Sequence, residues 1–273
     1  MLGYLAQKVL CCGAADCDDV FIKNRPHTTS RCDWCRLRPV ESGVVTTLPA
    51  AVLWDMDGTI IDTEPFWMKA ETELVHSYGG TWSHEDALTL VGQGLDHSAR
   101  VLQSRGVELG EDEIVQLLTG IVVNRVVEEG LPWRPGAREL LKELRAAGIP
   151  TALVTMSIRR LAVMVDEAIE FDAFDVVVAG DDVTHSKPHP EAYLRAAELL
   201  GVDPIDCVAI EDSNPGVGAA VASGAATIGV PLNVALVDDG TFTTWDTLAG
   251  RRISDLAEVL AAARRVERQG SGA

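Results

Sequence analysis

The amino-acid sequence predicts an α/β protein: a Rossmann-like parallel-sheet core with helices on both faces, into which an α-helical cap is inserted. One observation behind this prediction is the alternation of short apolar runs with helical stretches from Pro49 onward, which is typical of a parallel sheet. The other is the stretch 64–132, which contains helical patterns only. At about 70 residues, this stretch is too long for an ordinary connection between a strand and a helix. We therefore expect it to form its own helical unit above the sheet.

The individual elements follow from apolar runs, turn residues and helix stop signals. Strands are expected at residues 50–55, 150–155, 175–179, 206–210 and 226–230. Cap helices are expected at 65–78, 84–91, 96–105 and 111–129, and core helices at 136–147, 157–169, 190–200, 214–223 and 253–267. These limits predict a core of residues 46–63 and 133–273 and a cap of residues 64–132. Hinges near residues 62–65 and 131–136 would let the cap close on substrate and exclude water.

Residues 1–45 differ from the rest of the chain because they show no helical or strand period. Five of the six cysteines lie there: Cys11, Cys12, Cys17, Cys32 and Cys35. Cys32 and Cys35 have the spacing of half a zinc site, but no regular four-ligand pattern follows. We expect a poorly ordered extension that is dispensable for chemistry. No methionine lies between Met1 and Met56, so a translation start near Val44 or Val45 is an open hypothesis that the intact mass of the native protein would test.

The composition is that of a soluble globular protein, with 47% hydrophobic and 23% charged residues. The formal charge of −18 argues against a nucleic-acid or anionic-membrane partner. Neither an apolar run of about 18 residues nor a signal peptide is recognisable, so we expect a cytoplasmic protein. An anionic substrate could bind against this charge only where a cation such as Mg²⁺ is held by clustered acids. Composition does not predict the oligomeric state.

Two aspartates follow the first predicted strand, in the run Asp55-Met56-Asp57-Gly58-Thr59. Because side chains alternate along an extended chain, both carboxylates point the same way, at the strand ends where open α/β sheets bind ligands. A carboxylate can attack phosphorus while a neighbouring acid protonates the leaving group and a divalent cation neutralises charge. An ordinary turn is the alternative, because Asp and Gly are common turn residues.

The second predicted strand ends in Thr155, Met156 and Ser157, directly before a helix. A helix N-terminus offers free backbone N–H groups to an anion, and the two hydroxyls add donors. This run is therefore a candidate phosphate site. The alternative is that Thr155 or Ser157 is simply a helix N-cap.

Two further segments carry candidate site residues. Lys187 lies in Ser-Lys-Pro-His-Pro, where two prolines fix the backbone and would hold the lysine inward; a solvated surface lysine is the alternative. We expect the flanking His185 and His189 to be loop residues rather than metal ligands. Glu211 and Asp212 follow a buried strand, where adjacent acids are costly unless they are solvated or bound to metal. Asp212 or the next residue, Ser213, could also cap a helix.

Together these four segments, in this order at strand ends, resemble the haloacid dehalogenase superfamily of aspartate-nucleophile phosphotransferases. The helical insertion resembles the cap of the subgroup that holds β-phosphoglucomutase, phosphoglycolate phosphatase and sugar-phosphate phosphatases. The resemblance covers residues 50–230. It implies that Asp55 is the nucleophile and a Mg²⁺ ligand, and that Asp57 is the general acid and then base, with its backbone carbonyl on the metal.

The same resemblance implies that Thr155 and Lys187 hold the transferring phosphoryl group. It also implies that Asp212 ligates Mg²⁺ directly, with Glu211 close by or acting through water. We therefore expect a Mg²⁺-dependent phosphatase that acts through an aspartyl-phosphate. The Mg²⁺-independent dehalogenases of the superfamily lack the second aspartate, so Asp57 argues against dehalogenation.

A phosphomutase is the main alternative, and a non-catalytic regulatory module on the same fold is the third. The mutases of the subgroup carry a His where this chain has Trp67, and an Arg just beyond a cap glycine, where this chain has Gln93 after Gly92. Both differences favour a phosphatase. Five cap residues are candidates for contact with substrate, or for packing within the cap in the case of the tryptophans: Trp67, Trp82, Gln93, His97 and Arg100. Because basic residues are sparse in the cap, we expect a small, singly phosphorylated sugar or polyol.

Overall fold

The core of the molecule is a six-stranded sheet in the order β3-β2-β1-β4-β5-β6, in which every neighbouring pair is parallel. The computed structural model describes residues 47–270, so the predictions for residues 1–45 lie outside the described residues. The strands are β1 (Ala51–Trp54), β2 (Thr151–Val154), β3 (Val176–Val178), β4 (Cys207–Glu211), β5 (Ala226–Gly229) and β6 (Thr243–Thr244). The first five match the predicted runs. The two-residue β6 at the sheet edge was not predicted.

The central strand β1 is buried on both faces, which explains why its sequence is continuously apolar rather than alternating. Val52 and Trp54 pack into one hydrophobic core, and Ala51 and Leu53 into a second core on the opposite face. β1 pairs with β2 on one side and β4 on the other, with Val52 opposite both Thr151 and Val208. The carboxyl ends of these three strands therefore meet at one edge of the sheet.

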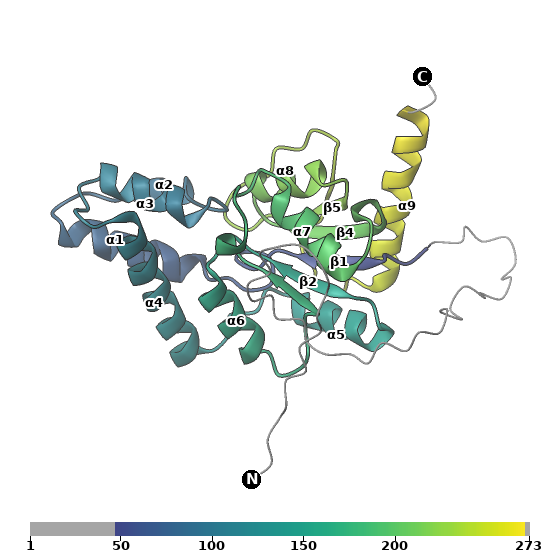
Figure 1. Ribbon diagram of the computed structural model, residues 1–273, viewed down its shortest axis with the longest axis horizontal. Helices are drawn as coiled ribbons and strands as arrows, with labels where there is room; N and C mark the ends of the chain where they lie inside the picture. The colour runs from purple at the N-terminus through teal and green to yellow at the C-terminus, as the bar shows by residue number, and fades with distance from the viewer. Residues whose placement is uncertain (1–46, 271–273) are drawn as a thin grey trace, which may run out of the picture.

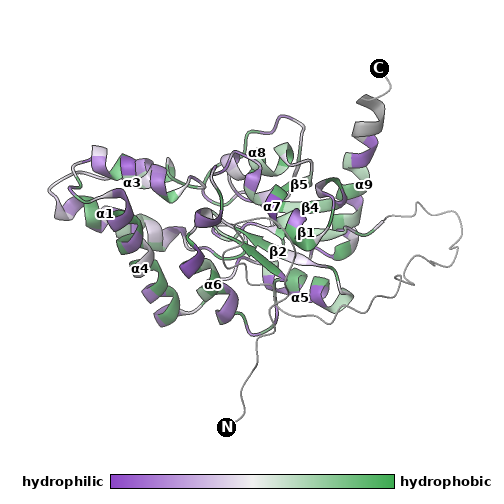
Figure 2. Cartoon of the chain, in the orientation of Figure 1, coloured by the Kyte–Doolittle hydropathy of each residue, from purple (hydrophilic) through white to green (hydrophobic). Residues whose placement is uncertain are grey.

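Helices cover both faces of the sheet, as the sequence predicts (Figure 1). The core helices are α5 (Ala137–Ala147), α6 (Arg159–Ala168), α7 (Glu191–Leu200), α8 (Asn214–Ala222) and α9 (Ile253–Gly270), with short 3₁₀ turns at Gly180–Asp182 and Pro204–Asp206. α5, α6 and α9 pack leucines and valines into the core of Val52 and Trp54, whereas α7 and α8 pack mainly alanines into the other. Figure 2 shows the labelled strands β1 and β2 in hydrophobic colours between helices with mixed faces.

The cap consists of α1 (Glu64–Ser77), α2 (His84–Leu88), α3 (Leu95–Ser104) and α4 (Glu111–Glu129), inserted between β1 and α5. In Figure 1 it forms a separate lobe at one end of the molecule, in which α4 packs on α1 and α3. α2 ends three residues earlier than predicted. The segment after it turns at Gly92, whose φ is +74°, and brings Leu90 and Gln93 to the core.

The two segments that connect cap and core lie side by side. Ile61 pairs with Trp133, the Asp62 N–H donates to Pro132 O at 2.8 Å, and the Arg134 N–H donates to Ile60 O at 2.8 Å. The buried Arg134 guanidinium also donates to the carbonyl oxygen of Gly58. The junction is therefore anchored to the loop that follows β1.

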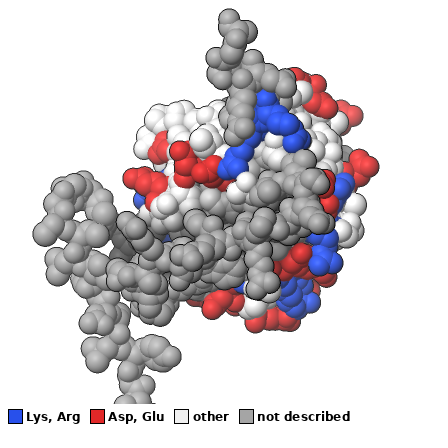
Figure 3. Space-filling model, turned by 90° about the vertical axis from the view of Figure 1, so that its right-hand side faces the viewer, with Lys and Arg blue, Asp and Glu red and all other residues white. Residues whose placement is uncertain are grey.

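On the face shown in Figure 3, Lys and Arg side chains lie among Asp and Glu, so the acidic excess of the chain does not form one continuous patch there. Within residues 47–270, no helix combines the length and the apolar character that crossing a membrane requires.

Candidate active site

A pocket lies between the carboxyl ends of the strands and the cap. Its core side is lined by Asp55, Asp57, Thr155, Met156, Ser157, Lys187, Asp212 and Ser213. Its cap side is lined by Glu64, Trp67, Glu71, Ala87, Leu90, Gly92, Gln93, Leu95 and Ser98. All but one of the core residues predicted from the sequence to form the site thus line one pocket, and the exception, Glu211, lies directly beneath it.

Asp55 stands at the end of β1 and is 6% exposed. Its Oδ1 accepts a hydrogen bond from Nζ of Lys187 at 2.7 Å, while its Oδ2 has no hydrogen-bond partner among the described residues. Burial and the nearby Glu211 carboxylate raise the pKa of Asp55 to about 7, and Lys187 opposes this shift. One oxygen of a fixed carboxylate therefore remains free to react with or bind a ligand.

Lys187 is buried, so the alternative of a solvated surface lysine is wrong. Its Nζ donates to Oε1 of Glu211 at 2.6 Å and to the carbonyl oxygen of Val154 at 3.0 Å, in addition to Asp55. Although burial alone would lower the pKa of Lys187, the two carboxylates outweigh it and raise the pKa above its usual value. The ammonium therefore stays charged. The backbone N–H of Lys187 donates to Sδ of Met156 at 3.3 Å, and this is the contact that Met156 supplies to the site.

Tyr193 of α7 is part of the site, although the sequence did not single it out. Its hydroxyl donates to Oε1 of Glu211 at 2.5 Å, and its ring lies 5.2 Å from Nζ of Lys187. Burial and Glu211 raise the pKa of this phenol well above its usual value, so it remains a donor. A tyrosine on the apolar face of a predicted helix reads as core packing, and only the spacing of α7 against β4 would have revealed it.

Asp55, Glu211 and Asp212 form a carboxylate cluster whose ligand atoms lie within 4.8 Å of one another. Oδ2 of Asp212, like Oδ2 of Asp55, is buried without a hydrogen-bond partner in the described chain. Burial and the neighbouring carboxylates raise the pKa of Asp212. Oxygen-only donors with unsatisfied buried atoms suit a hard cation such as Mg²⁺, so the residues present fit this ion. The side chain of Asp57 is outside the cluster.

Glycines let the backbone pass close to this cluster. A Cβ on Gly58, where φ is +83°, would lie 2.0 Å from Oδ2 of Asp212. A Cβ on Gly216 would lie 1.9 Å from Oε2 of Glu211. The helix α8 that contains Gly216 is capped by Ser213, whose Oγ accepts from the Gly216 N–H at 3.2 Å. Of the two candidate caps, Ser213 is therefore the actual one, and Asp212 is left to the cluster.

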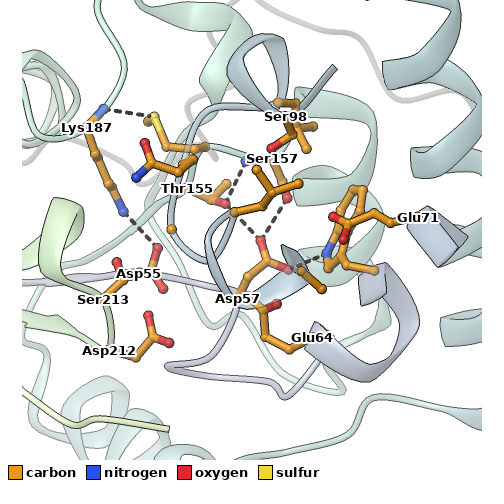
Figure 4. A pocket seen from close by; sticks show the side chains of 17 residues that line it. Asp55, Asp57, Glu64, Glu71, Ser98, Thr155, Ser157, Lys187, Asp212 and Ser213 are labelled. Atoms are coloured by element: carbon orange, nitrogen blue, oxygen red, sulfur yellow. Dashed lines mark hydrogen bonds and ion pairs between the residues drawn. The ribbon is translucent and has the colours of Figure 1, made fainter. Parts of the chain in front are cut away.

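The Asp57 carboxylate is held by four neutral donors. Oδ2 accepts from Oγ of Ser157 at 2.7 Å and from Oγ1 of Thr155 at 3.2 Å. Oδ1 accepts from the Thr63 hydroxyl and from Nε1 of Trp67 at 3.4 Å. The hydroxyls of Thr155 and Ser157 do not cap α6, whose N-cap is Ile158 without a side-chain bond, so the N-cap alternative is wrong for both. Figure 4 shows Asp57 between Asp55 and the cap residues.

The structure separates the five cap candidates. Trp67 and Gln93 line the pocket, whereas Trp82 is buried in the cap under the guanidinium of Arg105, 5.6 Å from the ring centroid. Arg100 pairs with Asp96 and Glu111 outside the pocket. His97 lies beside Arg100 in a neighbouring cleft that also contains His185 and His189. Trp82, His97 and Arg100 therefore do not line the site.

His185 and His189 are exposed loop residues. Their rings lie 4.5 Å apart, and Nδ1 of His185 contacts Oε2 of Glu191 at 2.7 Å. The same carboxylate accepts from the backbone N–H groups of Thr184 and His185, so Glu191 fixes the loop before α7. These three residues could hold a metal ion by proximity, but their hydrogen bonds are already those of a loop and helix start.

The chain has relatives of known activity. A sequence profile of the haloacid dehalogenase-like hydrolases matches residues 49–224. Hexitol phosphatase B of Escherichia coli (strain K12) is 33% identical over 218 residues, which make up 77% of this chain and 94% of that protein. The phosphorylated carbohydrates phosphatase of Thermotoga maritima is 34% identical over 176 residues, which make up 64% of this chain and 81% of that protein. A solved structure of a CbbY mutant from Rhodobacter sphaeroides, in complex with xylulose-(1,5)bisphosphate, is 28% identical with a TM-score of 0.71, and the match covers 77% of this chain and 99% of that one.

Proposed function

Because this chain belongs to the haloacid dehalogenase-like hydrolases, we propose that it is a Mg²⁺-dependent phosphatase that hydrolyses a sugar or polyol phosphate through an aspartyl-phosphate. The observation that carries this proposal is the Asp55 carboxylate. It is buried in the pocket, with Oδ1 fixed by Lys187 at 2.7 Å and Oδ2 without a partner in the described residues. A fixed carboxylate with one free oxygen is suited to attack phosphorus.

In the first half-reaction, Oδ2 of Asp55 attacks phosphorus while Asp57 donates a proton to the ester oxygen. The bond between phosphorus and that oxygen breaks, the alcohol leaves, and the phosphoryl group is on Asp55. In the second half-reaction, Asp57 takes a proton from water as the water oxygen attacks phosphorus. The bond to Asp55 breaks, inorganic phosphate leaves, and both aspartates return to their starting states.

The residues around these two aspartates have supporting roles. Thr155 and Ser157 orient Asp57 through their hydroxyls, and Lys187 provides positive charge beside Asp55. Asp55, Asp212 and, directly or through water, Glu211 would hold Mg²⁺, together with the backbone carbonyl of Asp57. When bound, the ion neutralises charge on the phosphoryl oxygens. Tyr193 and Glu211 hold the ammonium of Lys187 in place.

The pocket supports a phosphatase over a phosphomutase. A mutase of the β-phosphoglucomutase type must bind phosphate at both ends of an intermediate, which calls for a cation at the cap end. Among the residues that line this pocket, Lys187 is the only Lys or Arg, and it lies on the core side. The third alternative is a non-catalytic module. It would not explain why four hydrogen-bond donors hold the carboxylate of Asp57 in the pocket.

The relatives support a carbohydrate-type substrate, since hexitol and phosphorylated carbohydrates appear in the names of two phosphatases similar to this chain.

The test is phosphate release from a panel of sugar, polyol and acid monophosphates, with Mg²⁺ and with a chelator. We expect Mg²⁺-dependent release that Asp55→Asn abolishes. Asp57→Asn should slow both half-reactions for a sugar phosphate. With acetyl phosphate, whose acetate leaving group needs little protonation, only the second should be slow, so that mass spectrometry of this variant finds a phosphoryl group on the peptide containing Asp55. Turnover that survives Asp55→Asn contradicts the nucleophile assignment.

A further inference from the structure

The cap side of the pocket carries two acids and no base. Glu64, Trp67 and Glu71 lie on one face of α1, at the i, i+3 and i+7 spacing that brings helical side chains together, and all three line the pocket. Every basic side chain that the sequence places in the cap lies elsewhere. Each pairs with an acid at the surface: Lys69 with Glu73, Arg100 with Asp96 and Glu111, Arg105 with Asp86, and Arg125 with Glu129.

Glu71 is the unexplained member of this face. Its side chain is buried, with the residue 5% exposed, and its Oε2 has no hydrogen-bond partner among the described residues. The indole N–H of Trp82, which is also buried without a well-formed hydrogen bond, lies close enough to Glu71 to oppose the rise in pKa. Burial outweighs this contact and raises the pKa of Glu71 to about 8. A buried carboxyl oxygen without a well-formed hydrogen bond destabilises a fold. It is explained if its partner is a ligand.

The position of Glu71 in the pocket fits a role in contacting the part of the substrate remote from the phosphate. Figure 4 shows Lys187 and Glu71 on opposite sides of the pocket, with Asp57 between them. A substrate with its phosphate beside Lys187 would therefore extend past Asp57 toward Glu71. The neighbouring walls are apolar at Leu90 and Leu95, which suits the C–H faces of a carbohydrate.

We propose that Glu71 is a specificity-determining residue of the cap: its carboxyl hydrogen-bonds to hydroxyl groups at the far end of the substrate, so that the site accepts a neutral polyol or sugar monophosphate and rejects one with a second anionic group. This rests on the proposed phosphatase function. With a pKa of about 8 the Glu71 carboxyl is largely protonated at neutral pH, where it can both donate hydrogen bonds to hydroxyls and accept them. A carboxylate or a second phosphate would meet no Lys or Arg among the described residues on this side of the pocket, and above about pH 8 the ionised Glu71 would also repel it. Glu64, a second buried acid on the same face, has a pKa that burial likewise raises to about 8, so it provides no counter-charge for an anion either.

Three substrates test the proposal: a hexitol monophosphate, the aldonic acid monophosphate with the same carbon chain, and acetyl phosphate, which lacks hydroxyls. The wild type should prefer the hexitol over the acid in kcat/KM by about 100-fold, the ratio expected where a site is built for a neutral group and opposes a charged one. Glu71→Leu should lower kcat/KM for the hexitol about 10–100-fold more than for acetyl phosphate, because a site that loses a hydroxyl-binding group loses this much. At pH 9, where Glu71 is ionised, Glu71→Gln retains hydrogen bonding without the negative charge and should raise activity on the acid about tenfold relative to the hexitol.

Glu73→Gln is the matched control, because Glu73 lies on the same helix but is exposed and pairs with Lys69. It should leave all substrate ratios unchanged. Glu71 is a structural residue and the inference is wrong if Glu71→Leu lowers kcat/KM for the hexitol and for acetyl phosphate by the same factor. The inference is also wrong if this variant leaves the preference for the hexitol over the acid intact.

The two proposals fail in different ways. If the wild type releases no phosphate even from acetyl phosphate with Mg²⁺, the phosphatase function is wrong. Glu71 is then judged by calorimetry on the Asp55→Asn protein, where adding Glu71→Leu must weaken binding of the hexitol monophosphate about tenfold or more. Unchanged affinity there contradicts the inference.

Discussion

Nζ of Lys187 lies 2.7 Å from Oδ1 of Asp55, and both side chains are shielded from solvent, with 2% and 9% of their surfaces exposed. The lysine is 132 residues away from the aspartate in sequence, and the sheet brings them together where the ends of β1, β2 and β4 meet. Asp55, Glu211 and Asp212 place three acids around this one ammonium. The site is thus poised for a further cation, and its stability depends on the lysine.

Lys187→Met should destabilise the protein and abolish activity. The substitution keeps an unbranched side chain of similar length but removes the ammonium that pairs with the buried carboxylates of Asp55 and Glu211. Removing one partner of a buried ion pair costs about 3–5 kcal/mol. Thermal unfolding followed by circular dichroism, together with phosphate release, checks this. A variant that is as stable as the wild type would show that the ammonium does not neutralise the cluster.

Asp212→Asn should have the opposite effect on the stability of the metal-free protein. It removes one of three buried like charges and keeps the size of the side chain, so the melting temperature without Mg²⁺ should rise by a few degrees, on the order of 1–2 kcal/mol. Mg²⁺ should then fail to raise the melting temperature further, although it raises that of the wild type. A normal Mg²⁺ shift in the variant would exclude Asp212 as a ligand.

Tyr193→Phe tests the hydrogen bond between Tyr193 and Glu211, 2.5 Å long. Lys187 still neutralises Glu211 in this variant, so the expected loss of stability is modest, about 1–2 kcal/mol. We expect kcat to fall about tenfold with KM nearly unchanged, because the phenol positions Lys187 without touching substrate. An increase in KM at constant kcat would instead place Tyr193 in substrate binding.

Gly216→Ala and Gly120→Ala form a matched pair of helix substitutions. The Cβ of alanine at 216 would lie 1.9 Å from the Glu211 carboxylate, so this change should displace Glu211 and impair both stability and phosphate release. Position 120 in α4 has open space within 4 Å, and alanine there should stabilise the protein by about 0.5–1 kcal/mol. Equal effects of the two substitutions on urea unfolding would contradict the close approach at Gly216.

The raised pKa of Glu71 predicts a pH dependence of stability. With a pKa of about 8 in the folded protein against 4.5 ordinarily, the folded state keeps a proton that the unfolded chain releases between these values. The contribution of Glu71 to the free energy of unfolding is therefore fully present below about pH 4.5 and is lost as the pH rises through 8. The glutamine of Glu71→Gln cannot titrate, so the stability of this variant relative to wild type should rise from pH 5 to pH 9. The expected rise in the free energy of unfolding is about 1–3 kcal/mol, visible as a higher relative melting temperature. Exposed Glu73→Gln should show a flat difference over the same range.

The sequence predicted the sheet well because its strands are buried on both faces. β1, β2 and β4 are wholly buried, and such strands must be continuously apolar. The edge strand β6 has two partly exposed threonines and leaves no such pattern. α2 ends at Leu88, before the prediction, because the next residues form turns that bring Leu90 to the pocket instead of continuing the helix.

Most of the core side of the site was predictable because polar residues follow apolar strands there, whereas Lys187 was predicted from the prolines around it. Asp55, Thr155, Glu211 and Asp212 stand at strand ends and were found this way. Tyr193 and Glu71 were missed because they sit inside helices, where a tyrosine reads as packing and a glutamate reads as a solvated face. Their roles come from the contact of α7 with the sheet and of α1 with the pocket, which are tertiary relationships.

The donors to Asp57 come from both sides of the cap junction. Thr63 and Trp67 lie at the start of α1, while Thr155 and Ser157 follow β2. A chimaera that received a foreign cap from residue 65 onward would keep Thr63 but replace Trp67 together with Glu71. A change of cap that alters the substrate range therefore also alters the hydrogen bonds that hold Asp57. Substrate selectivity and turnover must for this reason be optimised together.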